Sequence, residues 1–136
     1  MFHLIKILNG RIGTPEPTRI PLSAAVTVRY GTPVIIKNGT LTPMSASAAS
    51  LPTHLILANA ENKTEVLATP ISPDMLFEVP VSVAPSGMKV EGEYLVADDG
   101  MSVTATAVTS GKRGATLVCA AGAFSAGDNL IVSFKN

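Results

Sequence analysis

Few side chains in this sequence could carry out catalysis, and those few are far apart. His3 and His54 are separated by about fifty residues, and neither has a nearby carboxylate or serine in the pattern that a catalytic triad or a general base requires. Cys119 is the only cysteine and lies in the apolar run TLVCAA, where a thiol is usually a small hydrophobic side chain rather than a nucleophile. We therefore expect both histidines to be surface or interface residues and Cys119 to be structural.

Sites for a phosphate or a metal ion are poorly supported as well. Lys112 follows a glycine in SGKRGAT, but a phosphate-binding loop needs another glycine five residues before that one and a serine or threonine after the lysine, where Thr106 and Arg113 stand. One thiol and two histidines cannot build a Cys/His metal set. The two aspartates of DDG (98–100) are typical of a tight turn, because their side chains accept backbone N–H groups. We predict no catalytic residue, no metal and no cofactor, and hence no enzyme.

Charge and composition argue for a protein that works in an assembly. Lysine plus arginine equals aspartate plus glutamate, so the formal net charge is zero, and only 15% of the residues are charged while 46% are hydrophobic. Such a chain has no field to attract nucleic acid or an anionic membrane, and it would tend to self-associate in solution. The opening MFHLIKILNG is too short to span a membrane and lacks a small-residue cleavage site, so we expect no signal peptide.

The apolar residues recur with a period of two, which predicts an all-β fold. No stretch keeps a helical apolar stripe for three turns. Asn38-Gly39 is the preferred pair for a two-residue type I′ hairpin, in which Lys37 would pair with Thr40 and Ile36 would lie opposite Leu41. A small-residue connector follows at 45–50, where a short helix is possible.

Further strands are predicted along the rest of the chain. A second hairpin is expected from 55–58 and 64–69, a strand at 75–83, and a third hairpin turning at Asp99-Gly100. Prolines in the middle third suggest edge strands and turns there, and not a continuous central sheet. The last two strands lie in ATLVCAA and NLIVSFK, with Leu130, Val132 and Phe134 facing inward. Six to nine short antiparallel strands predict a small single-domain β-barrel or β-sandwich, with a strand and Pro-rich arm at 1–22 and one β domain at 23–136.

Several segments together resemble a known class of virus protein. YGTPVIIKNGTLTPMSASAASLPTHLILANA, ISPDMLFEVP, GEYLVADDGMSVTAT and the opening LIKILNGRIGTPEP are similar, in type and order, to parts of the small β-rich proteins encoded beside the major capsid gene of tailed bacteriophages. The similarity covers nearly the whole chain and contains no catalytic signature. It implies a capsid decoration, or cement, protein: a structural virion protein, made in the host cytoplasm, that binds the outer capsid surface and stabilises the lattice of the major capsid protein, commonly as a homotrimer.

On this hypothesis the N-terminal segment is a candidate interface with the capsid or with another subunit. Prolines fix φ and favour an extended arm, which loses little entropy on docking. The preceding apolar residues would form a strand that adds to a neighbour's sheet edge, and two arginines would give polar contacts at its rim. The alternative is that residues 1–8 form an internal strand of the same domain and the arm is an ordinary loop. The candidate residues are Phe2, Leu4, Ile5, Ile7, Leu8, Arg11, Pro15, Pro17 and Arg19.

A second functional class remains open at this point. The chain could be a β domain of a phage fibre or tail, or of a bacterial surface adhesin, that binds a receptor or a carbohydrate. Sugar-binding platforms usually rely on aromatic faces. The chain has no tryptophan and only two tyrosines, which disfavours this alternative.

Overall fold

The computed structural model describes residues 1–7, 17–82, 87–120 and 127–135. These residues form eleven strands and no helix, and the strands make two antiparallel sheets. The prediction of a small all-β domain is confirmed, although the described residues contain more strands than the six to nine expected. None of these residues belongs to a helix that could cross a membrane.

The first sheet is built from the residues between the N-terminal strand and the middle of the chain. It contains β2 (Thr18–Val28), β3 (Pro33–Lys37), β4 (Thr40–Pro43), β5 (His54–Ile56) and β6 (Ala60–Pro70), in the order β2-β6-β5-β3-β4. Its local geometry follows from turn chemistry. Asn38 and Gly39 have φ of 52° and 75°, as a type I′ turn requires. The predicted register, Lys37 with Thr40 and Ile36 with Leu41, is confirmed.

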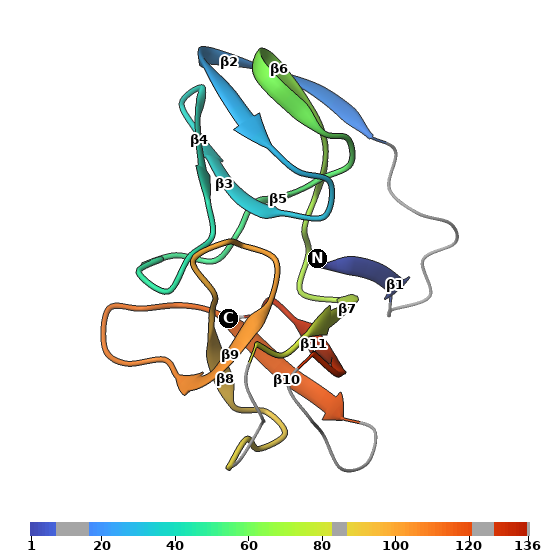
Figure 1. The fold of residues 1–136 in the computed structure, drawn as a ribbon, viewed down its shortest axis with the longest axis vertical. Coiled ribbons are helices and arrows are strands. Elements are labelled where there is room, and N and C mark those ends of the chain that lie inside the picture. The colour runs from blue at the N-terminus through green and yellow to red at the C-terminus, as the bar shows by residue number, and fades with distance from the viewer. Residues whose placement is uncertain (8–16, 83–86, 121–126, 136) are drawn as a thin grey trace.

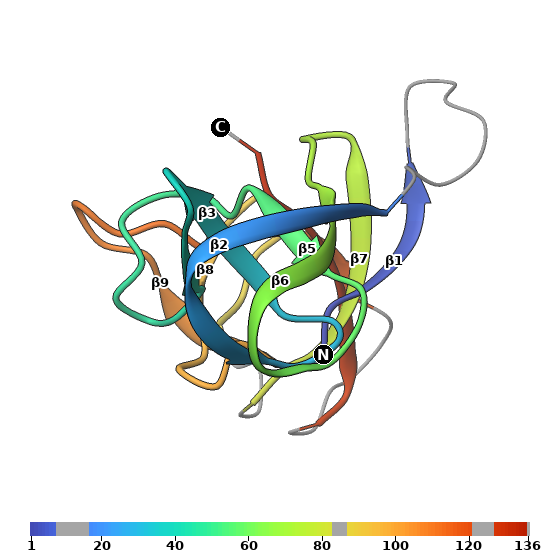
Figure 2. The ribbon, with the colours of Figure 1, turned by 90° about the horizontal axis from the view of Figure 1, so that it is seen from above.

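A sharp irregularity in β2 brings the two edges of this sheet together. Pro21 pairs with Glu65, but the next pair is Val26 with Lys63, so the β2 residues 22–25 lie opposite a single β6 residue. Bulges of this kind bend a strand, and β2 follows a wide arc around the sheet (Figure 2). Within the bulge the Ser23 N–H donates to the Gly39 carbonyl at 2.9 Å. This contact at the hairpin tip nearly closes the sheet into a barrel.

The second sheet collects the N-terminal strand and the second half of the chain. It contains β1 (His3–Ile7), β7 (Met75–Pro80), β8 (Glu93–Val96), β9 (Val103–Ala107), β10 (Ala115–Ala120) and β11 (Asn129–Ser133), in the order β1-β7-β11-β10-β8-β9. Just beyond β7, Val81 forms a parallel bridge with Val103, and the Ser82 N–H donates to the Val103 carbonyl at 2.8 Å. The β9 edge therefore curls back onto the end of β7. In this sheet β1 is the other edge.

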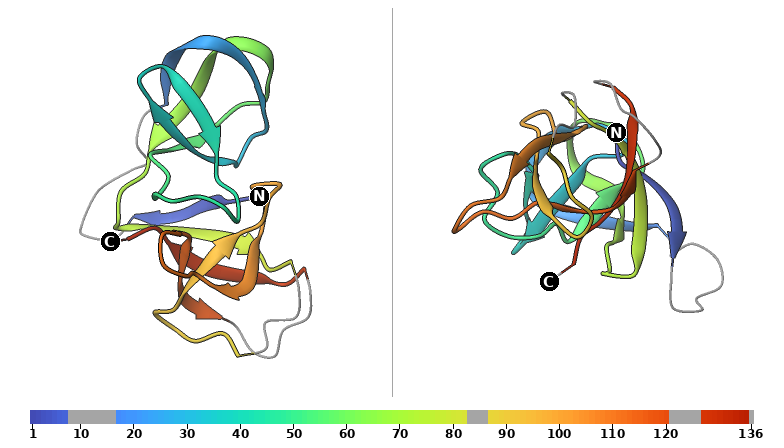
Figure 3. Two further views of the ribbon diagram at one scale, coloured as in Figure 1. Left: turned by 90° about the vertical axis from the view of Figure 1, so that its left-hand side faces the viewer. Right: turned by 90° about the horizontal axis from the view of Figure 1, so that it is seen from below.

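The two sheets stack on each other, and the larger of two apolar clusters includes residues from both. The barrel-like sheet lies above the second sheet in Figure 1, and the same stacking is seen from the side in Figure 3. Met44 and Leu55, from the barrel side, belong to the buried cluster that fills the second sheet. The barrel also has a smaller cluster of its own. Leu130, Val132 and Phe134 are at most 2% exposed, so their predicted inward face is confirmed.

Two expectations about local structure are wrong. β6 and β7 have neighbours on both sides and are not edge strands. Pro70 and Pro80 are the last residues of these strands, a position where a missing N–H interrupts no ladder. The predicted connector at 45–50 is confirmed, and it contains a turn and not the short helix that was possible there. Cys119 is exposed, because β10 has a register shift between Leu117 and Cys119 that turns its end to the other face.

Candidate functional site

The residues that sequence reasoning considered for chemistry do not gather in one place. His3 is exposed in β1, His54 is half-buried in β5, and Cys119 is exposed in β10. His54 Nδ1 lies 2.8 Å from the Thr53 hydroxyl oxygen, and burial lowers the pKa of His54 below the ordinary histidine value. Within the described ranges, no group of three or more His, Cys, Asp or Glu side chains is arranged to hold a metal ion.

The paired aspartates have the turn role that was predicted for them. Asp99 Oδ1 accepts the Met101 N–H at 2.9 Å, across a turn in which Gly100 has a φ of 70°. Asp98 Oδ1 accepts the Ala46 N–H at 3.1 Å and so ties this turn to the connector after β4. Both carboxylates therefore accept backbone N–H groups.

The first residues of the candidate interface lie in a strand of the same chain. β1 pairs with β7, with His3 opposite Glu78 and Leu4 opposite Phe77. Phe2 is fully buried, with its ring centroid 5.4 Å from that of Phe134 and 6.5 Å from that of Phe77. Phe2 therefore has no surface to offer to a neighbour in this structure, and the internal-strand alternative describes the first seven residues.

The other candidate residues have different surroundings. Leu4 is partly buried against the core, whereas Ile5, which sits in a register irregularity of β1, is 43% exposed. Ile7 is the last residue of β1. Pro17 is exposed just before β2. Leu8, Arg11 and Pro15 lie outside the described residues.

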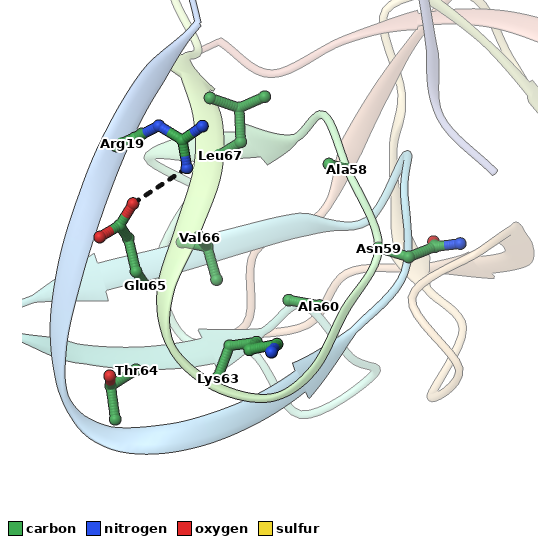
Figure 4. Close-up of a pocket in the computed structure, with 9 residues that line it drawn as sticks. All are labelled: Arg19, Ala58, Asn59, Ala60, Lys63, Thr64, Glu65, Val66 and Leu67. Atoms are coloured by element: carbon green, nitrogen blue, oxygen red, sulfur yellow. Dashed lines mark hydrogen bonds and ion pairs between the residues drawn. The ribbon is translucent and has the colours of Figure 1, made fainter.

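Arg19 lies in β2 beside a shallow groove along β6, which we call the β6 groove. Figure 4 shows the Arg19 guanidinium reaching toward Glu65, and the two side chains form an ion pair of 3.1 Å. Both are largely exposed, so the pair contributes little to stability. The cavity measures about 320 Å³. It is lined by Arg19, Ala58, Asn59, Ala60, Lys63, Thr64, Glu65, Val66 and Leu67.

A second groove, the β1 groove, lies where the edge of the second sheet meets the barrel. Its cavity measures about 190 Å³. It is lined by His3 and Leu4 of β1, Pro17 before β2, Tyr30 after β2, Leu55 and Leu57 in and after β5, and Thr69 of β6. Most of this lining is apolar, and none of it carries a carboxylate, an ammonium or a guanidinium group. The β1 groove is therefore suited to an uncharged apolar group.

Exposed apolar side chains concentrate around this groove. Among the described residues, the large hydrophobic side chains that are exposed are Met1, Ile5, Tyr30 and Val90. Tyr30 lines the β1 groove, Ile5 follows its residues in β1, and Met1 packs against Gly31, next to Tyr30. Only Val90 belongs to another part of the chain.

Sequence reasoning found one side of the β1 groove and missed the other. Leu4 and Pro17 were candidates because they belong to the N-terminal segment. Tyr30, Leu57 and Thr69 were not, because each lies in or beside a strand of the barrel and looks like an ordinary strand residue. No local signal marks them. They meet β1 only because the barrel stacks on the second sheet.

The comparisons with known proteins agree with this architecture and define no family. No family model matches the chain, and no curated protein sequence matches it. A solved structure, the crystal structure of the head fibre gp8.5 N base in bacteriophage phi29, matches over 88% of this chain and 94% of that one, with a TM-score of 0.53 and 12% sequence identity. The two chains share a fold. At this identity the likeness concerns the fold alone, over nearly the full length of both chains.

Proposed function

We propose that this chain is a structural protein of a tailed-phage head, which binds the outer surface of the capsid and stabilises the lattice of the major capsid protein as a homotrimer. The observation that carries the proposal is the shared fold with the phi29 head fibre base over 88% of the chain. The order of segments that resembles phage decoration proteins supports it independently, because it was taken from residues and not from the fold.

Binding and stabilising a capsid requires a complementary protein surface and no reactive side chain. A ligand that prefers the mature lattice stabilises it by mass action. A trimer that bridges neighbouring capsid subunits gains effective concentration, so each single contact can be weak. The interface with the capsid would need to bury a total surface area of only about 1,600 Å², the standard size for a stable protein–protein contact. We accordingly propose that the protein acts without catalysis, cofactor, nucleic acid or membrane.

Co-sedimentation with capsids tests this function directly. The purified protein is mixed with expanded capsids that lack it, and the bound copies per major capsid subunit are counted after pelleting. Saturable binding at a fixed ratio, weaker binding to unexpanded shells, and trimers in sedimentation velocity are the expected results. Absence of binding to either kind of shell overturns the proposal, and a strictly monomeric protein both free and bound overturns the trimer.

The likeness to a fibre base favours a second candidate function. The related structure is the base of a head fibre, so this chain would hold a fibre or a receptor-binding element on the virion. Mass spectrometry of purified virions distinguishes the two functions. Detection of peptides from this chain in a virion protein of 14.0 kDa, the mass of the chain itself, supports the decoration function. Peptides on a much longer polypeptide, or in tail fractions, support the fibre.

A further inference from the structure

Among the described residues, β1 is an edge strand of the second sheet and lies beside the β1 groove. The barrel edges meet at Ser23 and Gly39, the bridge from Val81 occupies the Val103 end of the β9 edge, and Phe2, just before β1, donates its N–H to the Gly31 carbonyl. β1 pairs with β7 on one side, and within the described residues no strand pairs with its other side. Such an edge presents unpaired backbone N–H and C=O groups, to which an extended segment of another protein can add as a further strand.

The groove next to this edge has the size and chemistry for one aromatic side chain. A cavity of about 150 Å³ can hold benzene, and the β1 groove measures about 190 Å³. Leu4, Leu55 and Leu57 provide apolar contacts, and Tyr30 provides a ring for an aromatic pair. Strand addition typically combines backbone hydrogen bonds with pockets for alternate side chains, so an open edge and an adjoining pocket together suit a single occupant.

The chemistry of the lining also indicates what charge a side chain bound in the groove would have. The described residues that line the groove carry no carboxylate, ammonium or guanidinium group. A charged side chain would lose its hydration there without a counter-ion. Thr69 adds one polar feature: its hydroxyl is buried and has no hydrogen-bond partner among the described residues. Because that hydroxyl is also shielded from solvent, the surface that the groove offers is mainly apolar, and an uncharged aromatic ring suits it.

We propose that the β1 edge and the β1 groove together bind an extended, uncharged segment of the major capsid protein that inserts an aromatic side chain. This inference rests on the proposed function for the identity of the partner, whereas the chemistry of the groove stands on the structure. A second copy of this chain is the less suitable occupant. Two β1 edges that pair antiparallel are related by a two-fold axis and close a dimer, which does not fit the proposed trimer.

Capsid binding by three variants tests the docking surface. Ile5→Lys places a charge on the exposed edge, and Tyr30→Ala removes the ring from the groove; both side chains are more than one-third exposed, so the fold should tolerate the changes. Val90→Lys is the matched control, because Val90 is 59% exposed and distant in sequence from the groove residues. We expect the first two to weaken binding to expanded capsids about tenfold or more and the control to bind like the wild type.

The outcomes separate this inference from the proposed function. If the wild type binds capsids and all three variants bind equally well, the docking inference is overturned and the proposed function stands. If the wild type itself does not bind, the proposed function fails. Urea unfolding of each variant confirms that a loss of capsid binding is not a loss of fold.

The chemistry of the groove has a test that needs no capsid. The methyl-labelled protein is titrated with p-cresol, and two-dimensional NMR follows the methyl signals of Leu55, Leu57 and Thr69. We expect saturable shifts at these positions, none at Leu41 in the separate barrel cluster, and weaker shifts in Tyr30→Ala. An absence of saturable shifts at the groove methyls would show that the groove does not accept a phenol and would overturn its assignment as an aromatic pocket.

Discussion

Gly114 is the position where we expect a single methyl group to do the most damage. It stands immediately before β10, whose first residue, Ala115, pairs with Tyr94 of β8. A Cβ at Gly114 would lie 2.0 Å from the Tyr94 carbonyl oxygen and 2.7 Å from the Tyr94 carbonyl carbon. These are backbone atoms of a paired strand, so no flexible side chain can move aside. Gly114→Ala therefore forces β10 away from β8.

The cost of this movement can be estimated from what the β8–β10 contact contains. Overpacking a well-packed site typically costs about 1–3 kcal/mol. Here the displaced segment also carries the Gly114 N–H, which donates to Glu93 Oε2 at 2.7 Å, and the neighbouring Arg113 ion pair to the same carboxylate. We expect the free energy of unfolding to fall by about 3 kcal/mol or more. For a domain of this size, this corresponds to a decrease in Tm of about 10 °C.

Urea unfolding followed by circular dichroism measures this difference, with Gly111→Ala as the control. Gly111 has a φ of 80° and open space around its Cβ position, so alanine there meets backbone strain without a clash. Strain of this kind costs about 1–2 kcal/mol. If Gly114→Ala is no less stable than Gly111→Ala, then β8 and β10 can separate at little cost and the close-approach argument is refuted.

Three further predictions concern single side chains. Because burial lowers the pKa of His54, the unfolded state binds its proton more readily, so the free energy of unfolding should fall as the pH drops below about 6.5 and level off below the folded pKa. Urea unfolding measured over this pH range should show a weaker pH dependence for His54→Asn than for the wild type. Glu93→Gln should destabilise the fold by about 1–2 kcal/mol in the same assay, because its half-buried carboxylate accepts charge-assisted hydrogen bonds. Arg19→Ala, at an exposed ion pair, should change the free energy of unfolding by less than about 0.5 kcal/mol. Equal effects of the two substitutions would contradict the argument from burial. Exposed Cys119 should react with a thiol reagent in the native protein, and reaction only after unfolding would contradict its placement.

Local chemistry explains the features that the sequence predicted correctly. Asn38-Gly39 determines its hairpin because both residues tolerate the positive φ that the turn requires, and the register of β3 with β4 then follows from the turn. The aspartates before Gly100 act in the same way. The alternation of Leu130, Val132 and Phe134 predicts their buried face, because side chains of a strand alternate between its two faces.

Other features depend on strand pairings between residues that are distant in the sequence, and a local sequence pattern cannot predict such pairings. β1 pairs with β7, so His3 finds its partner at Glu78, far along the chain. The prolines of β6 and β7 led to the prediction that these are edge strands. The tertiary structure shows that each strand has a neighbour on both sides and that its proline is its last residue. The side chain of Cys119 turned outward because of one register shift in β10. A shift by one residue exchanges the two faces of a strand, and alternation alone cannot reveal it.

The same distinction between local sequence and long-range packing applies to the candidate site. Composition and residue alternation are sufficient to predict an all-β chain of zero net charge with an apolar N-terminal strand, and they contain no local motif for catalysis. The tertiary structure decided which of those apolar residues are available: it buries Phe2, exposes Ile5 and brings Tyr30 and Leu57 of the barrel side next to Leu4 of β1. The physical reason is that a groove between two stacked sheets is a property of how the sheets pack, and that packing joins residues whose separation along the chain carries no signal.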